Sequence, residues 1–208
     1  MIVAVAEESR GAETARPWIE AAAPEYWSLI DPAHEVAALY GMVNVPQAVW
    51  IDEAGKIVRG PETAGSTDHF RRMDRVAKTM APKDAAARLA ARVAYMDAVR
   101  DWVRTGRYAL DGDAARQALP DITPDMAEAQ AQFRLGLWLR DQGRTAEATT
   151  HLARASALHP ESWNMWRQAA DLEAIGNSGG AGFWARVEAL GDRAYYPAPD
   201  LPGFPAAR

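Results

Sequence analysis

The stretch VPQAVWIDEAGKIV, residues 45–58, carries the clearest local pattern in the chain. Gln47–Asp52 is rich in β-forming residues, and the tight-turn sequence Glu53-Ala54-Gly55 follows it. Lys56–Arg59 then reads as a returning strand. Because two β-rich runs joined by a short glycine-containing turn are typical of an antiparallel pair, this stretch predicts a β-hairpin.

Short strands and helices alternate on either side of this hairpin. Apolar runs of β-formers predict the strands, whereas N-capping residues and closing glycines predict the helices. Because successive side chains of a strand point to opposite faces, we expect Trp50 and Ile51 on opposite faces of the sheet, with a helix covering each face. The expected order is β-α-β-α-β-β-α, in which strands at Ile2–Ala6 and Glu25–Ile30 and helices at Thr14–Ala23, His34–Tyr40 and Thr67–Met80 surround the hairpin.

The rest of the chain has an almost entirely helical pattern. We place the boundary near Thr79–Lys83, where Ala81-Pro82 interrupts a helix, so that the expected domains are 1–80 and 81–208. The predicted fold class is therefore α/β plus all-α.

The helical part begins with a long amphipathic helix, Lys83–Thr105. Its apolar residues are expected at Leu89, Val93, Met96 and Val103, with Tyr95 and Trp102 alongside. Further helices are expected at Pro124–Asp141, Thr145–Leu158, Pro160–Ile175 and Gly182–Ala194, followed by a proline-rich, non-helical tail at Tyr195–Arg208.

Composition and charge exclude several classes of function. The 208-residue chain has a net charge of −5, and phosphate binding needs a concentrated basic face, so we expect no nucleic-acid partner. No apolar run is long enough to span a bilayer and no basic, apolar leader is visible, so we expect a cytoplasmic protein without a membrane partner. The chain contains no cysteine, which excludes disulfides, thiolate nucleophiles, redox dithiols and cysteine-based metal sites.

A family resemblance becomes visible around the hairpin. Residues 40–58, YGMVNVPQAVWIDEAGKIV, resemble the YGV-x-x-x-P-T-x-F-x-I-D-x-x-G-x-I segment of thioredoxin-like proteins, in their TlpA/ResA-like and peroxiredoxin-related branch. Residues 27–37, WSLIDPAHEVA, resemble the P-V-L-x-D-P-x-x-x-V-A segment of the same branch, and the resemblance covers about residues 1–75. It implies that Val45 and Pro46 form the cis-proline step, where the backbone before the proline pairs with an extended substrate peptide.

The departures from the family pattern are as informative as the match. The match begins at Ile2, which corresponds to the second strand of the family, so the first strand and the active-site helix with its nucleophile have no counterpart. Gln47 replaces the usual Thr after the proline. The resemblance therefore implies a partial thioredoxin-like sheet in a protein of the thiol–disulfide oxidoreductase/peroxiredoxin-related group. As given, the chain is expected to be redox-inactive, with no catalytic residues.

Three explanations for the missing strand stay open. The sequence is a fragment or starts too far downstream, as it would if a selenocysteine codon were read as a stop; it is a natural redox-dead remnant; or another polypeptide donates the strand. Unpaired backbone groups cost about 1–3 kcal/mol each when buried. We therefore expect Ile2–Ala6 to pair directly with Gln47–Asp52, the alternative being a homodimer through the exposed sheet edges.

The second half shows a spacing typical of tetratricopeptide repeats (TPRs), whose 34-residue unit places small residues where two helices cross. Residues 129–162 resemble one full repeat and residues 163–194 a divergent second one. This resemblance implies an antiparallel TPR-like helical domain and an alternative function, a non-catalytic module that binds a protein or peptide partner. It rests on Leu135, Gly136, Ala148, Ala155 and Pro160, with Leu135, Leu152 and Trp166 expected to fill the groove between paired helices.

Other candidate chemistry is weak. Ser9, Ser28 and Ser66 lack the strand-to-helix turn of a nucleophile elbow. We expect no cofactor. The candidate site residues are Val45 and Pro46, which the resemblance supplies. No i, i+4 pair links the histidines, so we expect no metal site at His34, His69, His151 or His159.

Overall fold

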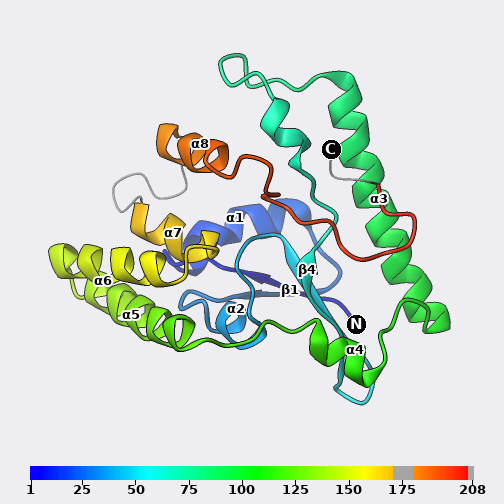
Figure 1. The fold of residues 1–208 in the computed structure, drawn as a ribbon, viewed down its shortest axis with the longest axis horizontal. Helices are drawn as coiled ribbons and strands as arrows, with labels where there is room; N and C mark the ends of the chain where they lie inside the picture. The colour runs from blue at the N-terminus through cyan, green and yellow to red at the C-terminus, as the bar shows by residue number, and fades with distance from the viewer. Residues whose placement is uncertain (171–179, 206–208) are drawn as a thin grey trace. The chain divides into compact units, whose positions relative to one another are not determined.

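The computed structural model describes residues 1–170 and 180–205, which form a mixed α/β fold (Figure 1). Among these residues, no helix is both long and apolar enough to cross a membrane. The strands are β1 Val3–Ala6, β2 Trp27–Ile30, β3 Gln47–Ile51 and β4 Ile57–Thr63. The helices are α1 Ala12–Ala22, α2 Glu35–Tyr40, the 3₁₀ helix η1 Asp68–Arg72, α3 Pro82–Thr105, α4 Gly112–Gln117, α5 Pro124–Asp141, α6 Thr145–Leu158, α7 Trp163–Ala170 and α8 Ala181–Glu188.

The chain packs as two compact units, each built from two separate segments. The first unit is Met1–Asn44 with Asp121–Gly176, and the second is Val45–Pro120 with Asn177–Arg208. Each unit takes residues from both sides of the boundary expected near Thr79–Lys83. The limits of the units therefore do not coincide with domains at 1–80 and 81–208, and that division stays a prediction.

A two-stranded parallel sheet, β1–β2, lies in the first unit and is connected through α1. Val3 pairs with Trp27 in its register. The expected pairing of Ile2–Ala6 with Gln47–Asp52 is wrong, because the described strands form two separate sheets, β1–β2 and β3–β4. Pairing with the next strand in sequence satisfies one edge of β1 at a lower loop-closure cost than pairing with the more distant β3.

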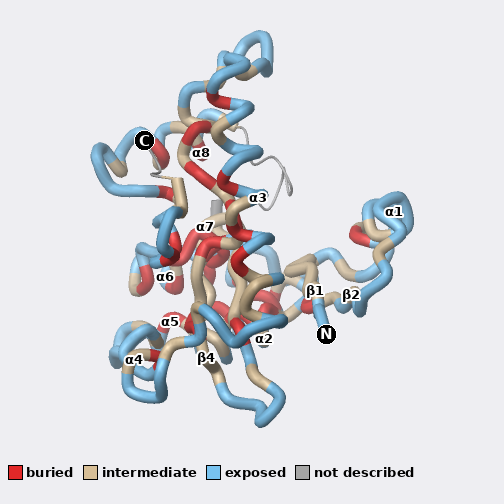
Figure 2. The backbone as a smooth tube through the Cα atoms, turned by 90° about the vertical axis from the view of Figure 1, so that its right-hand side faces the viewer, coloured by how far each residue is buried: buried red, intermediate tan, exposed pale blue. Residues whose placement is uncertain are grey.

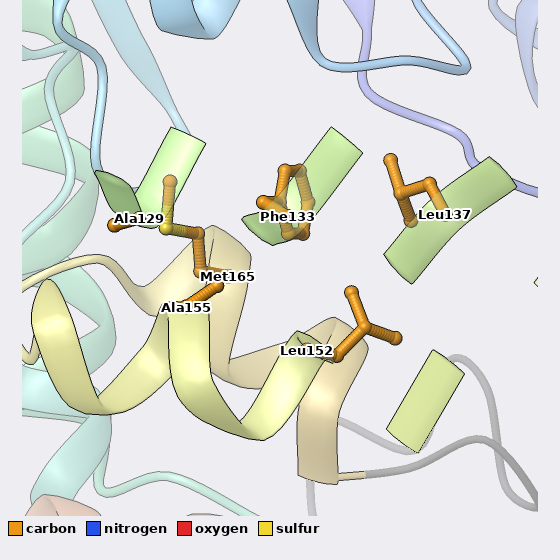
Figure 3. Packing of buried hydrophobic residues seen from close by; sticks show 6 residues of the cluster. All are labelled: Ala129, Phe133, Leu137, Leu152, Ala155 and Met165. Atoms are coloured by element: carbon orange, nitrogen blue, oxygen red, sulfur yellow. The ribbon is translucent and has the colours of Figure 1, made fainter. Parts of the chain in front are cut away.

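The helical hairpin α5–α6 provides the apolar core of the first unit, and α7 packs against α6. Figure 3 shows the buried side chains gathered between these helices. Because the cluster is aliphatic apart from one phenylalanine, its contribution to stability comes from apolar burial and close packing. Its members are Ala129, Phe133, Leu137, Leu152, Ala155 and Met165.

Small residues lie where α5 and α6 cross, as the spacing predicted. Ala148 and Ala155 are fully buried, and a Cβ atom added at Gly136 would lie 2.7 Å from Leu152 Cγ. The expectation for Leu135 is wrong, since its side chain is 41% exposed. Side chains three and four residues apart share a helix face, so the face toward α6 carries Phe133 and not Leu135.

The β-hairpin predicted from VPQAVWIDEAGKIV is confirmed in the second unit as the antiparallel pair β3–β4. Gly55, in the turn, has a φ of +76°, a conformation that residues with a Cβ rarely adopt. The Asp52 carboxylate accepts the backbone N–H of Ala54 and of Lys56, which closes the turn. Trp50 is 3% exposed and Ile51 is 40% exposed, so the two lie on opposite faces as expected.

The long helix predicted at Lys83–Thr105 is confirmed as α3, but of its expected apolar residues only Tyr95 is buried and only Trp102 is partly buried. Leu89, Val93, Met96 and Val103 are exposed. The side of α3 that packs against Trp50 instead carries Tyr95 and Ala98, with Val99 and Trp102 partly buried beside them. Figure 2 shows buried and exposed positions alternating along α3.

The helix expected at Thr67–Met80 is also wrong, because only η1 is helical there. The Asp74 carboxylate accepts the backbone N–H of Val76 and of Ala77, which competes with helical hydrogen bonding. A bridge between Asp74 and Thr79 then closes a local turn. No helix therefore covers a sheet face from this segment.

Candidate functional site

The Val45-Pro46 peptide bond is cis, as the resemblance predicted. Both residues are exposed at the start of β3. Their carbonyl oxygens have partners within the second unit: the Pro46 carbonyl accepts the backbone N–H of Ala64 at 3.1 Å. The Val45 carbonyl accepts the Tyr196 hydroxyl, also at 3.1 Å. A hydroxyl from the chain's own C-terminal segment therefore occupies the backbone acceptor that the resemblance assigns to a substrate peptide.

The segment Tyr195–Leu201, called the C-terminal segment, contacts the rest of the second unit at several points. The Asp68 carboxylate accepts the backbone N–H of Tyr195 at 2.9 Å and of Tyr196 at 2.7 Å. The Arg59 guanidinium donates to the Asp200 carbonyl at 2.8 Å. Leu201 is buried against the cluster around Trp50. These contacts hold Tyr196 where its hydroxyl reaches Val45.

A buried polar network joins β3 and β4 to α3. Arg59, 4% exposed, donates two hydrogen bonds to Glu62 and stacks over the Trp50 ring. The Tyr95 hydroxyl accepts the Trp50 indole N–H at 2.8 Å and donates to Glu62 at 3.0 Å. Burial, with the Glu62 charge adding to it, raises the pKa of Tyr95 well above its ordinary value. The tyrosine therefore stays protonated and serves as a donor.

A second polar cluster lies at the carboxyl ends of β1 and β2, where open parallel sheets usually carry their sites. The Ser9 hydroxyl and His34 Nε2 are hydrogen-bonded at 2.7 Å. His34 Nδ1 lies 3.4 Å from a Glu7 carboxylate oxygen, and both side chains are buried. The Asp31 carboxylate accepts the backbone N–H of Glu35 and Val36, which caps α2.

In space, the Ser9 hydroxyl, the His34 imidazole and the Glu7 carboxylate follow one another as the nucleophile, the general base and the orienting carboxylate do in a catalytic triad. The geometry departs from that arrangement at the acid, because His34 Nδ1 has no hydrogen-bond partner among the described residues despite its closeness to Glu7. The His34 ring packs edge-on against Phe133 of α5 at 5.3 Å. Arg140 of α5 also donates to the Ser9 carbonyl. The cluster therefore joins the strand ends to the helical hairpin.

Sequence reasoning found no link between Ser9 and His34, because it searched for nucleophile elbows and for histidine pairs. The signal that identifies the cluster is positional. Glu7 and Ser9 follow the first parallel strand, and Asp31 and His34 follow the second. The carboxyl ends of paired parallel strands meet at one edge of a sheet, so these side chains come together.

The α5 helix exposes two large apolar side chains one turn apart, Leu135 at 41% and Trp138 at 53%. Neither belongs to the core of the hairpin. The Arg154–Glu128 ion pair links α6 to α5. Exposed aromatic side chains are enriched at protein-binding surfaces.

The histidines do not assemble a metal site. No group of three or more His, Asp or Glu among residues 1–170 and 180–205 has the geometry to hold a metal ion. His69 is hydrogen-bonded to Thr67, and His151 to Gln132. His159, at the end of α6, is buried, and its Nδ1 has no hydrogen-bond partner among the residues that the structure describes.

The chain matches no protein-family model, and neither the curated proteins nor the solved structures include a significant match to it.

Proposed function

We propose that this chain is a thioredoxin-like protein of the thiol–disulfide oxidoreductase/peroxiredoxin-related group that does not itself catalyse thiol–disulfide exchange. The absence of cysteine carries the second part of this proposal. Exchange proceeds through attack by a thiolate on a disulfide sulfur, and the chain supplies neither the thiolate nor the resolving thiol. The first part is supported by the order β-α-β-α-β-β from β1 to β4.

In this proposal the chain cannot catalyse exchange but still binds a peptide at Val45 and Pro46. An extended peptide binds there through backbone hydrogen bonds, as in other cases of strand addition. The Tyr196 hydroxyl competes with a peptide N–H for the Val45 carbonyl. The proposed site is therefore one where a bound peptide weakens the hydrogen bond of Tyr196 to Val45.

Reduction of insulin by dithiothreitol, followed by turbidity, tests the catalytic part. We expect the rate with the purified full chain to equal that of dithiothreitol alone. Circular dichroism on the same sample verifies that the chain is folded. A rate above the reagent background from folded protein contradicts the proposal, because no thiol of this chain is available to produce it.

A second candidate function is a non-catalytic protein- or peptide-binding module in the helical hairpin, which we base on the exposed Leu135 and Trp138. Buried tryptophans are frequent hot spots of interfaces, so Trp138→Ala should weaken binding at least about tenfold. Trp18→Ala is the matched control, since Trp18 is a 78% exposed tryptophan of the same unit. Binding of a fluorescent peptide library to the immobilised full chain measures both. Equal binding by the two variants contradicts this assignment of the surface.

A further inference from the structure

The α3 helix carries a row of apolar side chains that its own unit leaves exposed. Leu89 is 60% exposed, Val93 48%, Met96 36% and Val103 67%. Exposed apolar residues scattered singly need no explanation, whereas a continuous row along one helix indicates an interaction surface. The row spans most of the length of a 24-residue helix.

The row lies on the back of α3. An α-helix turns about 100° per residue, which places the row roughly 150° around the axis from the buried side chains of the same helix. The buried side is formed by Ala91, Tyr95 and Ala98. The contacts that fix α3 to the Trp50 cluster therefore cannot cover the row.

The spacing of the row identifies its partner as another helix. Counted as heptads, Leu89, Met96 and Val103 fall at successive d positions. Ala86, Val93 and Arg100 fall at successive a positions, and all six are exposed. A hydrophobic repeat of 3.5 residues is the seam of a coiled coil, in which each side chain fits between four residues of the facing helix. One part of the seam, with Val93 at a and Leu89 at d, has the pair of residues that favours two strands.

Charges beside the seam fit a second, parallel copy of the same helix. In a parallel pair, a g residue faces the e residue five positions later on the partner. Arg92 is at g and Asp97 is at e, so the pairing brings opposite charges together on both sides of the two-fold axis. Both residues are exposed. An identical helix thus supplies the complementary charge along with the complementary seam.

We propose that the chain forms a homodimer through α3, as a parallel two-stranded coiled coil with the seam Ala86, Leu89, Val93, Met96, Arg100 and Val103. Arg100 is the single charged residue in this seam. Asp97 of the same helix lies 2.8 Å from its guanidinium, so in the dimer one carboxylate lies between this Arg100 and the Arg92 of the other copy. A single polar a position lowers stability but fixes the register and the number of strands. This proposal does not depend on the proposed function.

Disulfide trapping tests the geometry, because the chain contains no cysteine of its own. Leu89→Cys and Arg88→Cys place a thiol on neighbouring residues of α3, the first in the seam and the second outside it. After mild oxidation of each full-length variant, we expect a covalent dimer for Leu89→Cys and only background for Arg88→Cys. Equal cross-linking of the two variants overturns the proposed seam.

Leu89→Cys, together with a third variant, Arg100→Cys, distinguishes a parallel dimer from an antiparallel one. In an antiparallel pair Leu89 faces Arg100, so a mixture of Leu89→Cys and Arg100→Cys chains would cross-link while Leu89→Cys alone would not. That pattern overturns the parallel arrangement.

Light scattering across a concentration series tests the assembly without oxidation. The unmodified chain should approach twice its 22.7 kDa mass, and Val93→Glu should remain at the single-chain mass with an unchanged circular dichroism spectrum. Arg88→Glu, the control outside the seam, should still dimerise. A single-chain mass for the unmodified protein throughout the series overturns the proposal, as does a dimer that Val93→Glu leaves intact.

Discussion

The two compact units differ in what fills their cores. The apolar cluster of the first unit, between α5, α6 and α7, contains no charged side chain, and the adjacent Gly136 lets α5 and α6 approach closely. The second buries Trp50 and Tyr95 together with the ion pair of Arg59 and Glu62. Apolar packing tolerates volume-conserving changes, whereas a buried polar network fails when one partner is removed. The two units should therefore respond to different kinds of substitution.

Arg59→Leu should have the largest effect. It leaves the Glu62 carboxylate, whose side chain is 12% exposed, without its cation, and it removes the hydrogen bonds to the Tyr108 and Asp200 carbonyls. Breaking a buried pair from one side costs about 3–5 kcal/mol. Urea unfolding measures the change in the free energy of unfolding. Arg154→Leu breaks an exposed pair and should cost less than about 1 kcal/mol, so equal losses in the two variants would contradict the importance of burial.

Leu152→Ala should be the most damaging truncation in the first unit. Leu152 is fully buried, and its side chain occupies the space next to Gly136 where a Cβ atom would lie. Truncation of a buried leucine costs about 2–5 kcal/mol through lost apolar contact and the remaining cavity. Leu135→Ala on the exposed side of α5 is the control and should change the free energy of unfolding by less than about 0.5 kcal/mol. Similar effects at the two positions would show that the helices pack in another phase.

Gly136→Ala tests the close approach of the same two helices. Alanine normally favours a helix over glycine by about 1 kcal/mol. Here the new Cβ would lie 2.7 Å from Leu152 Cγ and 3.2 Å from the Leu152 backbone nitrogen. Because Leu152 has no exposed space to move into, we expect a net loss of about 1–3 kcal/mol. Thermal unfolding should show a lower Tm, and a raised Tm would mean that the helices lie further apart.

His159 should give the first unit a modest pH dependence. Burial lowers the pKa of His159 below its ordinary value of 6.5, although Glu161 opposes the shift. Below pH 6.5 the unfolded chain binds a proton that the folded chain resists, so this contribution to stability is present above that pH and is lost as the pH falls through it. His159→Gln should flatten the dependence of the free energy of unfolding on pH just below 6.5. An unchanged pH profile would place the titrating group elsewhere.

The elements that local chemistry determines could be predicted from the sequence. The hairpin β3–β4 follows from β-rich runs around a glycine turn, and the small residues at the α5–α6 crossing follow from their spacing. Long-range choices could not be predicted. The partner of β1 depends on the loop-closure cost of each possible pairing, which the strand pattern alone does not give.

The buried side of α3 could not be read from hydrophobicity alone. Leu89 and Val93 are more apolar than Tyr95, yet Tyr95 is buried because it satisfies both the Trp50 indole and the Glu62 carboxylate. A periodicity count weighs apolar character and misses hydrogen bonds that form only in the folded chain. The hydrogen bond between Ser9 and His34 also forms only in the folded chain, because 25 residues separate the two in sequence.

Hydrogen exchange in Arg59→Leu tests the central claim, that the apolar cluster between α5 and α6 and the polar network around Arg59 stabilise their units separately. Backbone amides report local stability, so loss of protection locates the damage. We expect faster exchange in β3, β4 and α3, while α5 and α6 keep the protection that they have in the unmodified chain. Equal loss of protection in α5 and α6 would contradict separate cores and show that the chain unfolds as one cooperative unit.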